Sequence, residues 1–125
     1  MKLKVLCIEP MRKPVVKEIE SGLSSLQHEV GGLIEAVYPF EDPVAIIVDE
    51  EGKLKNYPYN RILWDENHRF RDILCGTFLV VGLGCEDFCS LSDEMIAKYS
   101  EFFKVPEYFF MDESGIKVLP MIGLA

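Results

Sequence analysis

The sequence has few histidines and no long apolar run. Only two histidines are present in 125 residues, His28 and His68, which leaves little material for a catalytic base of the Ser–His or Cys–His type. No stretch approaches the roughly 18 to 20 apolar residues that a membrane-spanning helix requires. Glu9, Pro10 and Arg12 interrupt the N-terminal apolar segment before a signal peptide could form. We therefore expect no membrane span and no histidine-based nucleophilic site.

Cysteine pairs are also scarce. Of the four cysteines, only Cys85 and Cys89 lie close together, whereas a zinc site needs four ligands that usually come in two such pairs. A chain without an export signal is not expected to carry a disulfide framework, so reduced thiols and a cytoplasmic location are predicted. Buried cysteines pack as small apolar residues. We predict no metal, no cofactor and no catalytic residue.

Positive charge is the third deficit. Thirteen Lys and Arg stand against 21 Asp and Glu, which gives a formal net charge of −8. This balance repels a phosphate backbone, so direct binding to nucleic acid is not expected. Excess carboxylates keep a surface soluble, and they would also suit a protein that imitates DNA and occupies a basic cleft on another protein.

The length and composition predict one domain over residues 1–125, because 49% hydrophobic content is enough for a single core. Alternating apolar residues predict a strand at 1–8. Pro14 and apolar residues at helical spacing then predict a helix that runs to Val30 and ends at Gly31-Gly32. Residues 33–38 and 44–49 are expected to form an antiparallel strand pair, with 53–56 as the third strand of a meander.

The second half of the chain is less regular. Residues 57–71 lack a clean period and predict a loop or a short helical turn around 60–65. The apolar run 76–82 predicts a central strand covered on both faces. A helix capped by Ser90 or Ser92 should follow, and residues 116–119 could add a last strand. The expected fold is α+β, a small mixed or mainly antiparallel sheet with two main helices packed on it.

Polar residues near glycines are the best candidates for a site. Glu35 falls between apolar residues in a predicted strand, so a half-buried carboxylate there would need a partner, and Arg61 is the natural one. That pair would be either structural or a ligand contact. Asn60 and Arg61 follow two tyrosines, so they could recognise a base, phosphate or carboxylate, or they could tie down a loop. Gly82-Leu-Gly84 lacks the third glycine and the following helix of a dinucleotide fingerprint.

Several short segments, in their order and spacing, resemble a bacterial and phage family, the domain of unknown function numbered 3846. They are Leu26-Gln27-x-x-Val30-Gly31-Gly32-x-Ile34-Glu35, Glu50-Glu51-Gly52-Lys53, Asn60-Arg61, the run Gly76 to Gly82, and Leu91-Ser92-Asp93-Glu94. The resemblance covers about residues 3 to 109. One departure is Asp49, where the family often has Asn. The resemblance implies an accessory protein of phages and conjugative elements, without implying an activity.

These observations lead to a hypothesis of a non-enzymatic accessory protein that binds a protein or a small ligand. The candidate ligand-binding residues are Gln27, Gly31, Gly32, Glu35, Asn60 and Arg61. Two alternatives stay open, an acidic decoy of a DNA-binding protein and a sponge for a nucleotide signal. An unpaired edge strand of the meander could also support a homodimer.

Overall fold

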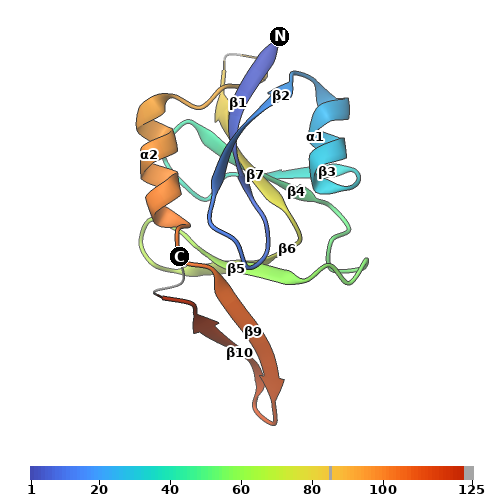
Figure 1. Ribbon diagram of the computed structural model, residues 1–125, viewed down its shortest axis with the longest axis vertical. Coiled ribbons are helices and arrows are strands. Elements are labelled where there is room, and N and C mark those ends of the chain that lie inside the picture. The colour runs from blue at the N-terminus through green and yellow to red at the C-terminus, as the bar shows by residue number, and fades with distance from the viewer. Residues whose placement is uncertain (85, 123–125) are drawn as a thin grey trace.

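A sheet of antiparallel strands forms the centre of the computed structural model, which describes residues 1–84 and 86–122 (Figure 1). Its strands lie in the order β2-β1-β7-β4-β3, and β8 pairs with β7. Two hairpins, β5–β6 and β9–β10, form sheets of their own. The elements are β1 (Lys2–Ile8), β2 (Val15–Glu20), α1 (Leu23–Val30), β3 (Ile34–Val37), β4 (Val44–Asp49), β5 (Tyr59–Trp64), β6 (Phe70–Cys75), β7 (Phe78–Leu83), β8 (Phe88–Cys89), α2 (Asp93–Phe102), β9 (Glu107–Asp112) and β10 (Gly115–Pro120).

Strand β7 is the middle of this sheet, as its continuous apolar sequence predicts. It pairs with β1 on one side and β4 on the other, and five of its six residues are buried. Side chains alternate between the two faces of a strand, so the sheet has two cores. Val80 belongs to the core under α2, whereas Leu79 and Val81 belong to the core under α1.

The two helices cover opposite faces of the sheet (Figure 1). Tyr99 and Phe103 pack with the core on one face, and Leu26 and Val30 of α1 pack with the core on the other. The prediction of an α+β fold with mostly antiparallel strands is therefore confirmed. Strands make up much more of the chain than helices do, and the helices are short.

The prediction of one long first helix is wrong for the N-terminal half of that segment. Residues Val15–Glu20 form β2, which pairs with β1 over six residue pairs. Val15, Val16 and Ile19 are β-branched and therefore suit a strand. Their spacing also matched a helix, and the pairing with β1 across the hairpin, for example of Ile19 with Leu3, makes this segment a strand. The end of the helix is confirmed, since Gly31 has φ 100°, a left-handed conformation.

The predicted meander and loop are also wrong. The β3–β4 pair is antiparallel as expected, but residues 53–56 form turns and not a third strand. Residues 59–64 are β5 and pair with β6 across a hairpin. Irregular pairing between Leu63 and Trp64 breaks the alternation, which explains why no period was visible in the sequence. Leu63 and Leu74 join the core beneath α2.

The second helix and the last strand follow their sequence signals. Ser92 caps α2 by accepting a hydrogen bond from the Met95 N–H at 3.2 Å. Residues 116–119 lie within β10, which pairs with β9 over six residue pairs. The β9–β10 hairpin, which we call the arm, projects from the rest of the molecule along its long axis (Figure 1). No helix in the described part of the chain is long and apolar enough to cross a membrane.

Candidate functional site

Asn60 and Arg61 lie side by side in the interior at the start of β5. Their side chains are 0% and 2% exposed. The Asn60 amide donates to the carbonyl oxygens of Ile8 and Gly76 at 2.9 and 2.8 Å. Its oxygen accepts a 2.8 Å hydrogen bond from Arg61. Asn60 therefore ties the end of β1 to the turn that precedes β7.

Arg61 makes a hydrogen bond with each of its five N–H groups. Nε and Nη2 donate to the Phe103 carbonyl at 3.3 and 3.0 Å, and Nη2 also donates to the Arg12 carbonyl at 2.6 Å. Nη1 donates to the side-chain and backbone oxygens of Asn60. The guanidinium thus links β5, the end of α2 and the loop after β1. No donor is left over for a ligand.

The charge of Arg61 lies close to one half-buried carboxylate. Burial lowers the pKa of Arg61, and the nearby Glu107 acts against this. Burial raises the pKa of Glu107, although its hydrogen bond from the Ile62 N–H and the charge of Arg61 oppose the rise. The predicted ion pair between Arg61 and Glu35 is wrong. Glu35 is exposed on β3, whereas the buried Arg61 guanidinium donates to backbone carbonyls such as that of Phe103.

The Gly31-Gly32 turn packs against a second polar cluster, formed by Asp49, Lys55 and Tyr57. A Cβ at Gly31 would lie 2.6 Å from the Tyr57 hydroxyl, and one at Gly32 would lie 2.9 Å from an Asp49 carboxylate oxygen. Asp49 accepts hydrogen bonds from Lys55 Nζ and from the Glu51 N–H, both at 2.8 Å. A side chain at either position would therefore require its neighbours to shift, and at Gly31 it would also have to adopt a positive φ of 100°.

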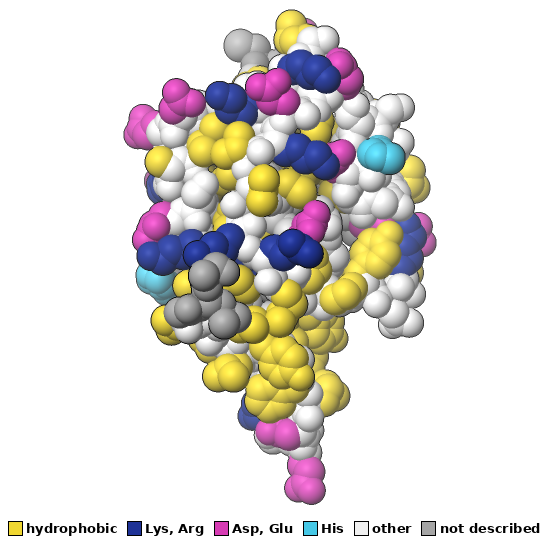
Figure 2. Space-filling model, viewed as in Figure 1, with side chains coloured by type: hydrophobic (Ala, Val, Ile, Leu, Met, Phe, Trp, Pro, Cys, Tyr) yellow, Lys and Arg dark blue, Asp and Glu magenta, His cyan; other side chains and the backbone are white. Residues whose placement is uncertain are grey.

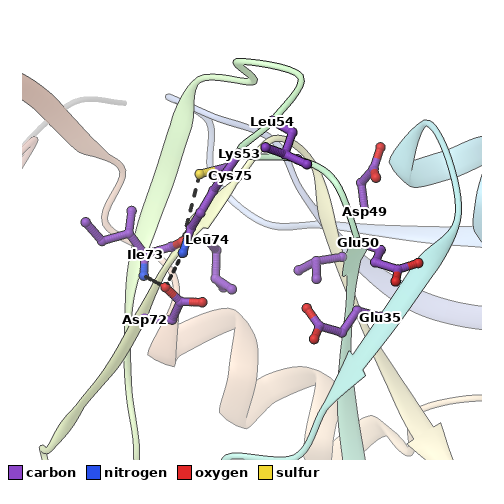
Figure 3. Close-up of a pocket in the computed structure, with 11 residues that line it drawn as sticks. Glu35, Asp49, Glu50, Lys53, Leu54, Asp72, Ile73, Leu74 and Cys75 are labelled. Carbon is purple, nitrogen blue, oxygen red and sulfur yellow. Dashed lines mark hydrogen bonds and ion pairs between the residues drawn. The ribbon is translucent and has the colours of Figure 1, made fainter.

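Glu35 belongs to a groove between the main sheet and the β5–β6 hairpin (Figure 3). The groove has a volume of about 240 Å³. Glu35 approaches it from β3 and Asp72 from β6, so carboxylates stand on both walls (Figure 3). Asp72 accepts a 2.5 Å hydrogen bond from Lys53 and a 2.8 Å one from the Ile73 N–H. The groove therefore holds opposite charges that already neutralise one another in part.

The predicted site residues thus fall into separate places. Gly31, Gly32 and Glu35 lie near Asp49 at one end of the main sheet, whereas Asn60 and Arg61 are interior. Gln27 is half-buried on α1, and its carbonyl accepts the 2.8 Å hydrogen bond that ends the helix. The structure does not gather these six residues around one cavity.

The residues considered for catalysis are scattered as well. His28 and His68 are both exposed, and burial raises the pKa of the Cys7 and Cys75 thiols. Cys85 lies outside the described residues. Among the described residues, no group of three or more His, Cys, Asp and Glu is placed to hold a metal ion. Gly82 has a packing role, since a Cβ there would lie 2.5 Å from the Ser90 carbonyl oxygen.

The arm carries the most exposed apolar surface in the second half of the chain. We call the side chains of Tyr108, Phe110, Met111, Ile116 and Leu119 the apolar arm surface; their exposed fractions lie between 41% and 72%. They lie on both faces of the hairpin, Tyr108, Phe110 and Leu119 on one and Met111 and Ile116 on the other. Figure 2 shows hydrophobic side chains running down the arm toward acidic residues at its tip. The sequence signal was available, because β9 and β10 carry apolar residues at adjacent positions and therefore present apolar side chains on both faces of the hairpin.

One comparison with known proteins decides the family. The model of the family described as a domain of unknown function (DUF3846) matches residues 1–104. The chain belongs to this family. The match confirms the resemblance seen in the sequence, and it includes the Gly31-Gly32 turn, Asn60 and Arg61. No curated protein and no solved structure matches the chain.

The DUF3846 match ends before the arm, which begins at Glu107. The matched part contains both polar clusters and the whole main sheet. Asn60 and Arg61 thus lie in the shared domain, where their hydrogen bonds join four segments of backbone. The apolar arm surface lies on a segment beyond the matched residues.

Asp49 gives a prediction about pH within this domain. Burial acts to raise its pKa, but hydrogen bonds from Lys55, the Glu51 N–H and Tyr57 bring the pKa below its usual value. A carboxyl with a lowered folded pKa stabilises the fold above its unfolded pKa of about 3.9, and this contribution disappears as the pH falls through the folded pKa. We expect Asp49→Asn to lose about 1 to 2 kcal/mol at pH 7.

The measurement is the free energy of unfolding by urea at a series of pH values. The gap between wild type and Asp49→Asn should close as the pH falls below about 4. Glu86→Gln, which removes one exposed carboxylate, serves as the control. A gap that stays constant down to pH 2 would show that the charge of Asp49 contributes nothing.

Proposed function

We propose that this protein is a non-enzymatic accessory protein that binds another protein, and that the arm is its binding element. The observation that carries the proposal is the apolar arm surface. An isolated two-stranded hairpin is marginally stable in water, and exposed apolar patches on soluble proteins commonly mark interaction sites. Aromatic residues and Met are enriched in the buried centres of such interfaces.

The base of the arm fixes its position against the domain. The Phe109 ring meets the Tyr59 ring edge-on, with their centroids 5.4 Å apart. Glu107 accepts a 3.1 Å hydrogen bond from the Ile62 N–H, and the Met121 N–H donates to the Pro106 carbonyl at 2.8 Å. These contacts hold the arm at its base while its outer part stays exposed. A pre-positioned element of this kind loses little entropy when it binds.

The apolar surface also continues onto the domain at the base of the arm. Trp64, Phe102 and Pro120 line one shallow pocket of about 300 Å³ there. The Trp64 and Phe70 rings lie edge to face with centroids 6.1 Å apart, and both are exposed. A partner that binds the arm could therefore extend its contact onto β5 and α2.

The two alternatives receive less support. An acidic decoy needs carboxylates in a stripe with the spacing of phosphates, but acidic residues in several parts of the domain form ion pairs with neighbouring Lys or Arg, as in Lys2–Glu20, Lys17–Glu29 and Lys98–Asp42. A nucleotide sponge needs Arg61 or Lys53 in reach of the ligand. The N–H groups of Arg61 already donate to oxygens within the protein, and Lys53 forms an ion pair with Asp72.

The proposal is tested by photo-crosslinking in cells that carry the gene. A benzophenone amino acid replaces Phe110 on the arm, and in a matched variant it replaces Tyr38, an exposed aromatic residue after β3. The arm position should give a covalent adduct with another polypeptide, and the control position should not. The Asn60–Arg61 cluster is left intact in both variants, so loss of fold is not expected.

A further inference from the structure

The pocket at the base of the arm combines aromatic rings with one half-buried carboxylate. Trp64 of β5 and Phe102 of α2 line it from the domain, and 39% and 40% of their surfaces are exposed. Glu107 and Pro120 line it from the arm, where they pair with each other across the hairpin. Its volume of about 300 Å³ is at the small end of the range for ligand pockets. The pocket therefore suits one side chain better than a large ligand.

The charged groups of this pocket offer a hydrogen-bond acceptor and no free charged donor. Arg61 lines the pocket, but its N–H groups already donate to oxygens of the protein. Glu107 Oε1 accepts from the Ile62 N–H at 3.1 Å, and within the described residues Oε2 accepts no hydrogen bond. His68, the other titratable residue of the lining, is exposed. A group that fits here donates to the carboxylate and packs against the rings.

We infer that the pocket takes an arginine side chain of the protein that binds the arm. This inference rests on the proposed function and specifies the chemistry of the partner. A guanidinium presents several N–H donors in one plane and stacks on aromatic faces, whereas an ammonium is a strongly hydrated point charge. Arginine is also enriched at protein interfaces, and lysine is depleted there.

The charge of the whole chain favours a basic partner. Its net charge of −8 attracts a cationic surface and speeds the encounter. The buried charge of Arg61 acts in the opposite direction, since it already interacts with Glu107. An ion pair with Glu107 would therefore be weak by itself, and stacking on Trp64 and Phe102 is needed to hold the guanidinium.

The pocket is continuous with one face of the arm. Side chains alternate between the two faces of a strand, so Glu107 and Pro120 share a hairpin face with Met111 and Ile116. Met111 and Ile116 are the members of the apolar arm surface on that face. A partner segment that lies along this face would contact both apolar side chains and bring an arginine to the pocket.

The fluorescence of Trp64 tests the inference, because Trp64 is the single tryptophan of the chain and lines the pocket. The probe is a leucine–arginine–leucine tripeptide with blocked ends, titrated into the full chain at constant ionic strength. It should change the emission saturably, with a Kd of about 1 to 10 mM. The same tripeptide with citrulline, a neutral isostere of arginine, should bind at least about tenfold more weakly.

A matched pair of variants tests the role of the carboxylate. Glu107→Gln should weaken binding of the arginine tripeptide at least about tenfold, and its amide oxygen can still accept from the Ile62 N–H. Glu113→Gln removes one exposed carboxylate at the tip of the arm and should leave binding unchanged. Circular dichroism checks that both variants fold.

Three results would overturn the arginine assignment. One is the absence of a saturable change up to about 50 mM of the arginine tripeptide. Another is equal affinity for the arginine and citrulline tripeptides, a comparison that uses only the wild-type chain. The third is unchanged affinity in Glu107→Gln.

The crosslinker at position 110 separates failure of this inference from failure of the proposed function. In that background, Glu107→Gln should lower the adduct yield at least about threefold, and Glu113→Gln should not. If neither substitution changes the yield, the arm binds a protein without an arginine in the pocket, so the proposed function stands and the inference is wrong. If no adduct forms at position 110, the proposed function fails and the inference loses its partner.

Discussion

Arg61→Ala is expected to lower the free energy of unfolding by about 3 to 5 kcal/mol. The substitution removes all five hydrogen bonds of the guanidinium and leaves the Phe103 carbonyl, the Arg12 carbonyl and the Asn60 side-chain oxygen without this donor. It also opens a cavity where the largest fully buried side chain stood. Domains of this size are stable by only about 5 to 15 kcal/mol, so a large part of the stability would be lost.

Urea unfolding followed by circular dichroism measures this effect. Arg71→Ala is the matched control, because Arg71 is an exposed arginine on β6 and its loss should change the stability by less than about 0.5 kcal/mol. Arg61→Lys should recover only part of the loss, since an ammonium has three donors on one atom and cannot span the same carbonyls. An Arg61→Ala protein as stable as wild type would show that the buried network is not structural.

Gly76→Ala is expected to cost about 2 to 4 kcal/mol. Gly76 has φ +73°, and a Cβ there would lie 2.6 Å from Cδ2 and 3.2 Å from Cβ of Tyr57. The fixed end of the tyrosine cannot move away easily. The position is also held by hydrogen bonds, because its N–H donates to the Pro58 carbonyl and its carbonyl accepts from Asn60, both at 2.8 Å.

Comparison with Gly115→Ala separates the cost of backbone strain from the cost of crowding against Tyr57. Gly115 also has a positive φ, +115°, but a Cβ there would meet no atom within 4 Å. Its substitution should therefore cost only the strain, about 1 to 2 kcal/mol. Chemical unfolding of both variants under the same conditions gives the comparison. Equal losses for Gly76→Ala and Gly115→Ala would mean that the contact with Tyr57 has no energetic weight.

The features that the sequence predicted correctly are those that local chemistry determines. The buried run of β7, the serine cap of α2 and the glycine that ends α1 depend on residues within a few positions of one another. The α+β class follows from the same signals. Families share such patterns, and this is why the DUF3846 resemblance could be seen in short segments.

The errors came where distant pairing decides the structure. Val15 to Glu20 fits either a helix or a strand, and the choice is made by β1, whose residues lie opposite. The β5 strand could not be recognised in the sequence, because the irregular register of its hairpin with β6 breaks the alternation of apolar and polar residues. Local preferences cannot report on a partner that is far away in the sequence.

The site shows the same division. The sequence singled out Asn60 and Arg61 as polar residues next to aromatic ones. It left two roles open for them, recognition of a ligand or holding a loop in place. Which carbonyls they bind depends on how β1, α2 and β7 are arranged, and the predicted contact with Glu35 was wrong for that reason. The exposure of the arm also depends on the three-dimensional arrangement, since the same apolar residues could have packed on the domain.

The central claim is that the arm binds protein, and photo-crosslinking at position 110 tests it most directly. The account predicts a covalent adduct with a second polypeptide at position 110 and none at position 38. The absence of any adduct at position 110, or the same adducts at both positions, would contradict it.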